Sequence, residues 1–349
     1  MKNTARLSAP TNVCLCVTSE CNLNCRHCFA RSTSSREDLS SAGISGIIRD
    51  LAARKVFFVS LFGGEPFIRG DIINIIALLS TFPIGISINT NATLIDDHLA
   101  KALADYKVSF VVSLDGSSAE IVDRIRGRGV FEKTLGGIRA LRKYNHDILI
   151  STTVMSHNYD NLFEIAALGK EAGAVGVRFN NVFYINNAEC YLKDIFLTPG
   201  QNLELYDTCE ELKARYGGFV SGSSLQTMDL IRAVRRNEIP CDGAPIQVPP
   251  CGAGIDKCAI KPDGEVTPCE VLWNTTAGNV RDKPFGEIWA DSPVLNEFRA
   301  SLCLSDLEIG DCISCRYRFI CFTGHRCVPY FSAGGIGNRD LYCIKTWMP

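Results

Sequence analysis

Long apolar runs are missing from this chain, and so is any marked excess of one charge. Its most apolar stretches, residues 55–62 and 72–79, are far shorter than the roughly 20 residues that a membrane-spanning helix needs. Lysine and arginine number 36 against 38 aspartates and glutamates, so the net charge of the chain does not favour binding to nucleic acid or to an anionic membrane. Residues 1–17 lack the apolar core of a signal peptide. We therefore expect a cytoplasmic protein that binds neither nucleic acid nor membrane.

Cysteine is absent from the middle of the chain only. None lies between residues 29 and 189, although the 349 residues contain 17 cysteines in all. Five lie in residues 14–28 and nine in residues 251–343. Secreted disulfide scaffolds are normally much shorter than this chain, and cysteines in a reducing compartment commonly bind metal. The distribution therefore predicts two metal-rich regions that flank a cysteine-free middle.

From residue 11 to residue 216 short β-branched runs alternate with helical patterns. The expected strands cover residues 12–18, 56–62, 84–89, 108–114, 147–154 and 175–181. The expected helices cover residues 38–54, 70–80, 95–104, 131–144, 159–172 and 200–216. This alternation predicts an α/β fold with a parallel sheet and right-handed crossovers. Six such units suit an open, partial barrel as well as a doubly wound sheet.

The alternation stops after Gly217, where a second region begins. Residues 225–236 predict a connecting helix, and a domain boundary is then marked by Pro240, Pro245, Pro249 and Pro250. We therefore divide the chain into residues 1–236 and residues 237–349. In the second part, residues 258–269 predict a hairpin that turns at residues 262–264, and residues 284–300 predict a short helix. No internal repeat or low-complexity tract is visible.

Three cysteines directly after the first expected strand carry the most informative pattern. Cys21, Cys25 and Cys28 have the spacing Cys-x3-Cys-x2-Cys. They can bind three irons of a [4Fe–4S] cluster and leave the fourth iron open to another ligand, which indicates chemistry at the cluster. Three buried thiols or part of a zinc site are the alternatives, but zinc sites prefer two close pairs of ligands.

A second motif, Gly63-Gly64-Glu65-Pro66, follows the second expected strand. It therefore falls at the same edge of the sheet as the cysteines, because parallel strands end together. Glycines allow the backbone to approach a ligand closely, and Glu65 can accept hydrogen bonds from an amino group. An amine site beside an open iron suggests an amino-acid-like ligand. Taken alone the motif is weak, since two glycines at a strand end are often only a turn.

Together the two motifs resemble those of the radical S-adenosylmethionine (radical SAM) superfamily. Its members carry Cys-x3-Cys-x2-Cys followed by a strand that ends in Gly-Gly-Glu-Pro. The resemblance implies a partial (β/α)6 barrel, similar to a TIM barrel, with its chemistry at the C-terminal ends of the strands. It also implies that SAM chelates the open iron and is cleaved reductively to a 5′-deoxyadenosyl radical, which abstracts hydrogen from the substrate. A low-potential donor such as flavodoxin or ferredoxin is expected.

Further residues resemble the SAM-binding segments of that superfamily. Ser113, in Ser-Leu-Asp-Gly, and Arg126 in the following helix are candidates for the methionyl carboxylate. Asn91 closes the third strand and is a candidate for the ribose, with Ala92 in place of the glycine that many relatives have. Phe29 resembles the aromatic residue that lies beside adenine. The alternatives are solvated loop groups, an ordinary helix arginine and a core phenylalanine.

The C-terminal cysteines form the second pattern. A zinc ribbon is an alternative, because Cys312-x2-Cys315 is a zinc-like knuckle with His325 nearby. Behind a radical SAM core, however, the array resembles the SPASM domain. That resemblance assigns auxiliary [4Fe–4S] cluster I to Cys251, Cys258, Cys269 and Cys327, and cluster II to Cys312, Cys315, Cys321 and Cys343, so three clusters are expected in all. Five residues separate Cys321 from Cys327 where relatives usually have three, which makes Cys327 the least secure ligand and leaves an open position on cluster I as an alternative.

Glu270 directly follows Cys269, where sulfatase-maturing relatives have an aspartate that is their proposed base. By that resemblance Glu270 is the candidate catalytic base, with a solvated surface carboxylate as the alternative. We expect radical modification of a peptide or protein side chain by cross-linking, epimerisation or oxidation. Few residues precede the first strand, so we expect no fused leader-binding domain, and a separate protein could supply recognition.

Two rival functions stay open at this stage. One is the same radical chemistry on a small molecule, such as a sugar, an aminoglycoside or a nucleoside. The other is a non-catalytic zinc or iron–sulfur binding module on an α/β scaffold. Fold and cofactor do not decide between substrates, because function depends on the site.

Overall fold

The structure is a computed structural model, and it describes residues 7–28, 30, 36–182, 194–224 and 251–300. Several predictions fall on other residues and lie outside this described part. They concern the connecting helix 225–236, Phe29, Cys312, Cys315, Cys321, Cys327 and Cys343.

A parallel sheet forms the centre of the fold, and its strands follow one another in chain order. They are β1 (Asn12–Cys16), β2 (Phe58–Phe62), β3 (Gly85–Thr90), β4 (Val108–Ser113), β5 (Asp147–Val154) and β6 (Gly176–Asn181). The six expected strands are thus confirmed. A short strand, β7 (Val220–Ser221), pairs in parallel with β6.

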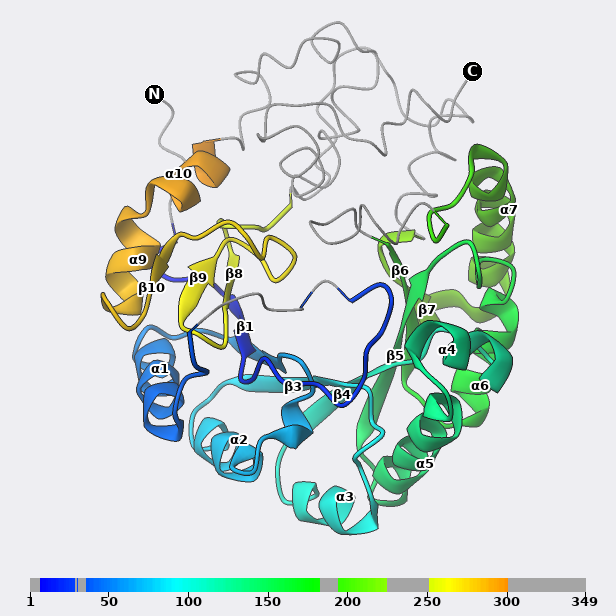
Figure 1. The fold of residues 1–349 in the computed structure, drawn as a ribbon, viewed down its shortest axis with the longest axis horizontal. Helices are drawn as coiled ribbons and strands as arrows, with labels where there is room; N and C mark the ends of the chain where they lie inside the picture. The colour runs from blue at the N-terminus through cyan, green and yellow to red at the C-terminus, as the bar shows by residue number, and fades with distance from the viewer. Residues whose placement is uncertain (1–6, 29, 31–35, 183–193, 225–250, 301–349) are drawn as a thin grey trace, which may run out of the picture.

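The helices lie on the outer, convex side of this sheet (Figure 1). Those that the sequence predicts are α1 (Ser41–Ala53), α2 (Ile72–Ser80), α3 (Asp97–Leu103), α5 (Val130–Lys143), α6 (Leu162–Glu171) and α7 (Pro199–Tyr216). One more helix, α4 (Ala119–Arg126), lies between β4 and α5. Local capping explains the starts of α1 and α3, because Ser40 and Asp96 accept hydrogen bonds from the backbone N–H groups of Gly43 and Leu99. None of the helices in the described ranges combines the length and apolar character that a membrane crossing requires.

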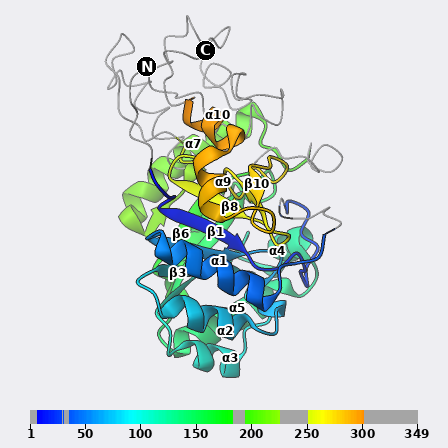
Figure 2. The ribbon, with the colours of Figure 1, turned by 90° about the vertical axis from the view of Figure 1, so that its left-hand side faces the viewer.

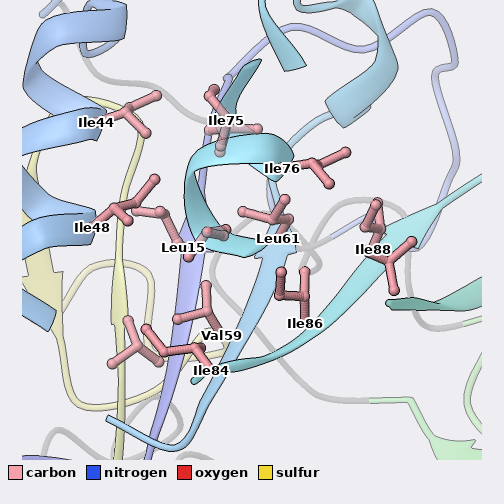
Figure 3. Packing of buried hydrophobic residues seen from close by; sticks show 14 of the residues in the cluster. Leu15, Ile44, Ile48, Val59, Leu61, Ile75, Ile76, Ile84, Ile86 and Ile88 are labelled. Atoms are coloured by element: carbon pink, nitrogen blue, oxygen red, sulfur yellow. The ribbon is translucent and has the colours of Figure 1, made fainter. Parts of the chain in front are cut away.

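The largest hydrophobic core lies between the sheet and these helices. Figure 3 shows Ile44 and Ile48 of α1 and Ile76 of α2 packed toward Leu15 and Leu61 of the neighbouring strands. Alternate residues of a strand point to opposite faces, so the same strands send polar side chains to the concave face. There Asn89 Nδ2 donates to Ser60 Oγ over 2.6 Å. The concave face of the sheet therefore carries polar side chains, whereas its convex face is apolar.

The predicted hairpin is confirmed, and it extends the same sheet. Strands β8 (Lys257–Ile260) and β9 (Glu265–Thr267) are antiparallel, and Gly264 in their turn has a φ of +89° that favours glycine. Strand β8 also pairs in parallel with β1, and β10 (Gly278–Asn279) pairs with β9. Figure 2 shows β8 beside β1. In the part of the chain that is described, the strand order runs from β10 to β7 without closing, so the sheet is an open barrel.

The sequence predicts one helix over residues 284–300, but two helices occupy this stretch. They are α9 (Phe285–Asp291) and α10 (Pro293–Ala300). Ser292 between them has φ −59° and ψ 122°, an extended conformation. A residue that precedes proline is pushed away from the helical region, so Pro293 ends one helix and begins the next.

Candidate active site

The three cysteines of the Cys21–Cys28 loop lie directly after β1, at the carboxyl edge of the sheet. All three are free thiols, with Cys21 exposed and Cys25 and Cys28 half-buried. Burial raises the pKa of Cys25 to about 11 and also raises the pKa of Cys21. Thiols bind iron as thiolates, so binding of a cluster would release these protons.

Gly63 and Gly64 bring the end of β2 against the start of the cysteine loop. The Gly64 N–H donates to the Thr18 carbonyl, and the Glu65 N–H donates to the Glu20 carbonyl, both over 2.8 Å. A Cβ atom on Gly64 would lie 1.9 Å from the Glu20 oxygen, and one on Gly63 would lie 2.5 Å from the Thr18 oxygen. The close approach that these glycines allow is thus to the cysteine loop itself. Pro66 follows as the first residue of a 3-10 turn, Pro66–Ile68.

Glu65 is almost fully buried, with 1% of its surface exposed. Its Oε1 accepts from Thr90 Oγ1 over 2.7 Å, and its Oε2 accepts from the Asn91 N–H over 2.8 Å. Burial raises its pKa to about 7, against the opposing effect of these hydrogen bonds. The carboxylate ties the end of β2 to the end of β3, and its contact with an amine of SAM stays a prediction.

Asn91 is bound to the cysteine loop from the other side. Its Nδ2 donates to Asn22 Oδ1 over 2.9 Å, and its Oδ1 accepts from Thr93 Oγ1 over 2.6 Å. Asn22 lies between the first and second cysteines of the motif. The next residue, Ala92, has a φ of +59°, which suits the glycine of many relatives better than alanine. Asn91 therefore positions the loop. Its contact with the ribose of SAM remains a prediction.

A buried ionic group lies behind Cys25. Asp115 is fully buried, and its Oδ2 lies 2.7 Å from Arg126 Nη2 and 3.4 Å from His27 Nε2. Its Oδ1 accepts from the Thr153 N–H over 2.9 Å. Arg126 Nη1 lies 3.9 Å from Cys25 Sγ, so its charge is next to a predicted iron ligand. Asp115 thus connects the cysteine loop with α4 and β5.

His27 is the site residue that the sequence interpretation missed, although it stands inside the cysteine motif, directly before Cys28. Burial lowers its pKa to about 4, and Asp115 offsets only part of this effect, so the imidazole is neutral. Within the described part of the chain, the buried His27 Nδ1 and Arg126 Nε have no hydrogen-bond partner. Buried polar atoms rarely stay unpaired, so these two beside Cys25 fit a site that receives a polar ligand. Ser113 ends β4 nearby in sequence and is half-buried.

Three of the eight predicted auxiliary ligands lie in the described ranges. Cys251 is half-buried, whereas Cys258 and Cys269 are buried. Cys258 belongs to the hydrophobic core beneath α1, and burial raises its pKa. Across the described residues, no three His, Cys, Asp or Glu side chains are grouped to hold a single metal ion. A [4Fe–4S] cluster binds each thiolate through a different iron, so it does not require such a group.

Glu270 lies between a cation and a thiol. Its Oε1 is 3.7 Å from Lys257 Nζ, and its Oε2 accepts from Cys269 Sγ over 3.1 Å. Burial opposes its ionisation, but Lys257 and the Cys269 hydrogen bond outweigh burial and lower its pKa. Glu270 is therefore ionised and able to accept a proton next to a predicted auxiliary ligand.

Comparison with known proteins assigns this chain to a family. Residues 15–169 match the model of the radical SAM superfamily, and residues 251–316 match SPASM, an iron–sulfur cluster-binding domain. Mycofactocin maturase MftC of Mycolicibacterium smegmatis is 30% identical over 98% of this chain and 84% of its own length. The AdoMet-dependent heme synthase of Methanosarcina barkeri is also 30% identical, over 97% of this chain and 98% of its own.

The fold is likewise that of a solved structure. Streptococcus suis SuiB bound to its precursor peptide SuiA superposes with a TM-score of 0.78 at 19% identity, covering 97% of this chain and 76% of that one. This chain belongs to the radical SAM superfamily and carries a SPASM domain. It is a radical SAM enzyme, and its domains imply [4Fe–4S] clusters and SAM as cofactors. The alternative of a non-catalytic zinc or iron–sulfur binding module is therefore wrong.

Proposed function

We propose that this enzyme modifies a side chain of a peptide or protein by cross-linking, epimerisation or oxidation. The observation that carries the proposal is the cysteine loop with Arg126 beside Cys25, at the edge of a sheet whose concave face carries polar side chains. The fold shared with SuiB, whose structure holds a precursor peptide, and the identity with a maturase support a peptide substrate.

In this proposal the residues at the carboxyl edge of the sheet hold the cofactors. Cys21, Cys25 and Cys28 would bind the catalytic cluster, which with SAM supplies a radical that abstracts a hydrogen atom. Arg126, kept in place by Asp115, offers a buried positive charge for the methionyl carboxylate, with Ser113 as a second donor. Because Arg126 Nη1 lies 3.9 Å from Cys25 Sγ, this charge would orient the ligand toward the cluster.

At the other end of the concave face, Glu270 would remove a proton from the substrate once the radical has formed. Its ionised carboxylate is held by Lys257 and faces Cys269. Once Cys269 binds iron as a thiolate it no longer donates to Glu270, so Lys257 is the group that lowers its pKa and keeps it ready to accept a proton at neutral pH.

The same radical chemistry on a small molecule is the second candidate. A specific observation favours it, because the identity with the heme synthase equals the identity with the maturase. Incubation of the reduced enzyme with SAM and candidate peptides or small molecules, followed by mass analysis, distinguishes the two. A mass change confined to a small molecule would contradict the peptide proposal.

We propose the cytoplasm as its compartment, where thiols stay reduced, and flavodoxin or ferredoxin as its electron donor. The assignment of the catalytic cluster is tested by replacing Cys21, Cys25 and Cys28 together by Ala. We expect 5′-deoxyadenosine formation to be abolished and the iron content to fall from about twelve to about eight per chain, since each cluster holds four irons.

The matched control is Cys209→Ala, which removes a buried thiol of α7 that is not part of the motif. It should keep both SAM cleavage and iron. If the triple variant still cleaves SAM, or if the purified protein is colourless and holds zinc, the cluster assignment is wrong.

A further inference from the structure

A pocket of about 340 Å³ lies on the face of the cysteine loop that is turned toward α5. One wall is the cysteine loop at residues 22–24, and a second is the segment after β3 at residues 93–94. The third wall runs from the end of α4 to the first turn of α5 and contributes Arg126, Arg128 and Lys133. This pocket is separate from the Lys257–Glu270 pair at the other end of the sheet.

The pocket carries an excess of positive charge. Arg126 is paired with Asp115, so the excess comes from Arg128 and Lys133, and the described lining residues include no acidic one. Arg128 and Lys133 are exposed, so their charges face the solvent. The nearby carboxylate of Asp123 is used locally, because it accepts from the N–H groups of Gly129 and Phe131 over 2.6 and 3.0 Å. These bonds fix the turn that presents Arg128.

Arg126 connects this pocket with the cysteine loop. Arg126 lines the pocket, and its Nη1 lies 3.9 Å from Cys25 Sγ. Its Nε is buried and has no partner in the described part of the chain. Electron transfer slows steeply with distance, so a redox centre held at this face would lie close to the iron that Cys25 binds.

We propose that this basic face is the docking site of an acidic electron-carrier protein of the flavodoxin or ferredoxin class. The inference rests on the proposed function, which requires reduction of the catalytic cluster. One electron leaves the reduced carrier, which is oxidised, and enters the cluster, which is reduced; no bond forms or breaks. Charge complementarity favours an acidic protein, since clustered charges steer diffusing partners and suppress wrong ones.

The test compares two reductants on the reconstituted holoenzyme. Arg128→Glu and Lys133→Glu are combined, and Lys107→Glu, an exposed residue directly before β4 at the opposite edge of the sheet, is the matched control. With reduced flavodoxin we expect the double variant to raise the KM for the carrier about tenfold. With dithionite, which needs no docking surface, its rate of 5′-deoxyadenosine formation should equal that of the wild type.

Binding of flavodoxin to the holoenzyme, measured by calorimetry, gives a second readout that does not depend on turnover. It should weaken in the double variant, weaken with salt in the wild type, and stay unchanged in Lys107→Glu. An unchanged KM for flavodoxin in the double variant overturns the proposal, as does an equal loss with both reductants. A wild-type enzyme that fails to cleave SAM with dithionite contradicts the proposed function instead.

Discussion

The Asp115 carboxylate lies 2.7 Å from the Arg126 guanidinium, and both side chains are buried behind Cys25. Removing two charges from water is costly, and the attraction between them repays that cost only with good geometry and further hydrogen bonds. Here the Thr153 N–H supplies such a bond to Asp115. The pair therefore fixes a cation next to the cysteine loop, where negative thiolates form when iron binds.

The first prediction concerns Asp115→Asn, which leaves Arg126 charged, buried and unpaired. Loss of one partner of a buried pair costs on the order of 3 kcal/mol, so the free energy of unfolding in urea should fall by about that amount. SAM binding should weaken as well, because Arg126 loses its support. Asp97→Asn removes an exposed carboxylate that pairs with Lys143 and should change neither quantity. Equal stability of the two variants would contradict a structural role for the buried pair.

The second prediction concerns the contact between Gly64 and the cysteine loop. In Gly64→Ala the new Cβ would meet the Glu20 carbonyl at 1.9 Å, so the loop must move. We expect a large loss of reconstituted iron, measured by iron and sulfide analysis of the anaerobic protein. The matched control is Gly46→Ala in α1, where nothing lies within 4 Å of the added Cβ. That change should keep the iron and stabilise the helix by roughly 0.5–1 kcal/mol. Normal iron loading in Gly64→Ala would show that the loop tolerates displacement.

Much of the barrel could be predicted because each strand and helix is determined by residues that are close together in the chain. Alternating burial in β5 and the apolar stripes of the helices follow from residues close in the chain. The pairing of β8 with β1 could not, since it joins residues more than 240 positions apart and depends on the shape of the whole sheet. Likewise the cysteines and the Gly63–Pro66 segment fell at the expected edge, because parallel strands end there together.

The roles within the site were harder to predict than its position. The sequence indicated that Glu65 can accept from an amine, which stays a prediction, but it did not indicate that the same carboxylate accepts from Thr90 and Asn91. It gave no reason to single out His27, because a contact with Asp115 joins segments that are distant in the chain. Such contacts are set by tertiary packing, which motif spacing does not encode.

The third prediction is a pH dependence that arises from Glu65. Its pKa is raised from 4.5 to about 7 by burial, so ionisation is harder in the folded state than in the unfolded chain. The stabilising contribution is complete below pH 4.5 and is lost as the pH rises to about 7. Over that window the free energy of unfolding should fall by on the order of 3 kcal/mol on account of this group. Urea unfolding at a series of pH values measures the profile.

The variant Glu65→Gln isolates this effect, because an amide does not titrate. Its stability relative to the wild type should improve steadily as the pH rises from 4.5 to about 7 and stay level above that. All other carboxylates contribute equally to both profiles and cancel in the difference. Parallel profiles for the two proteins would show that Glu65 does not titrate in this range.

The fourth prediction separates the base from the radical step. Glu270→Gln keeps the shape of the side chain but cannot take a proton, and it leaves Lys257 without its 3.7 Å partner. Product formation should fall by about 10²- to 10⁴-fold, while SAM cleavage to 5′-deoxyadenosine continues, because proton removal follows hydrogen abstraction. The control Glu287→Gln changes an exposed carboxylate of α9 and should affect neither. Mass analysis of substrate and 5′-deoxyadenosine in the same reaction gives both rates. If the two rates fall together in Glu270→Gln, the carboxylate supports the site rather than acting as its base.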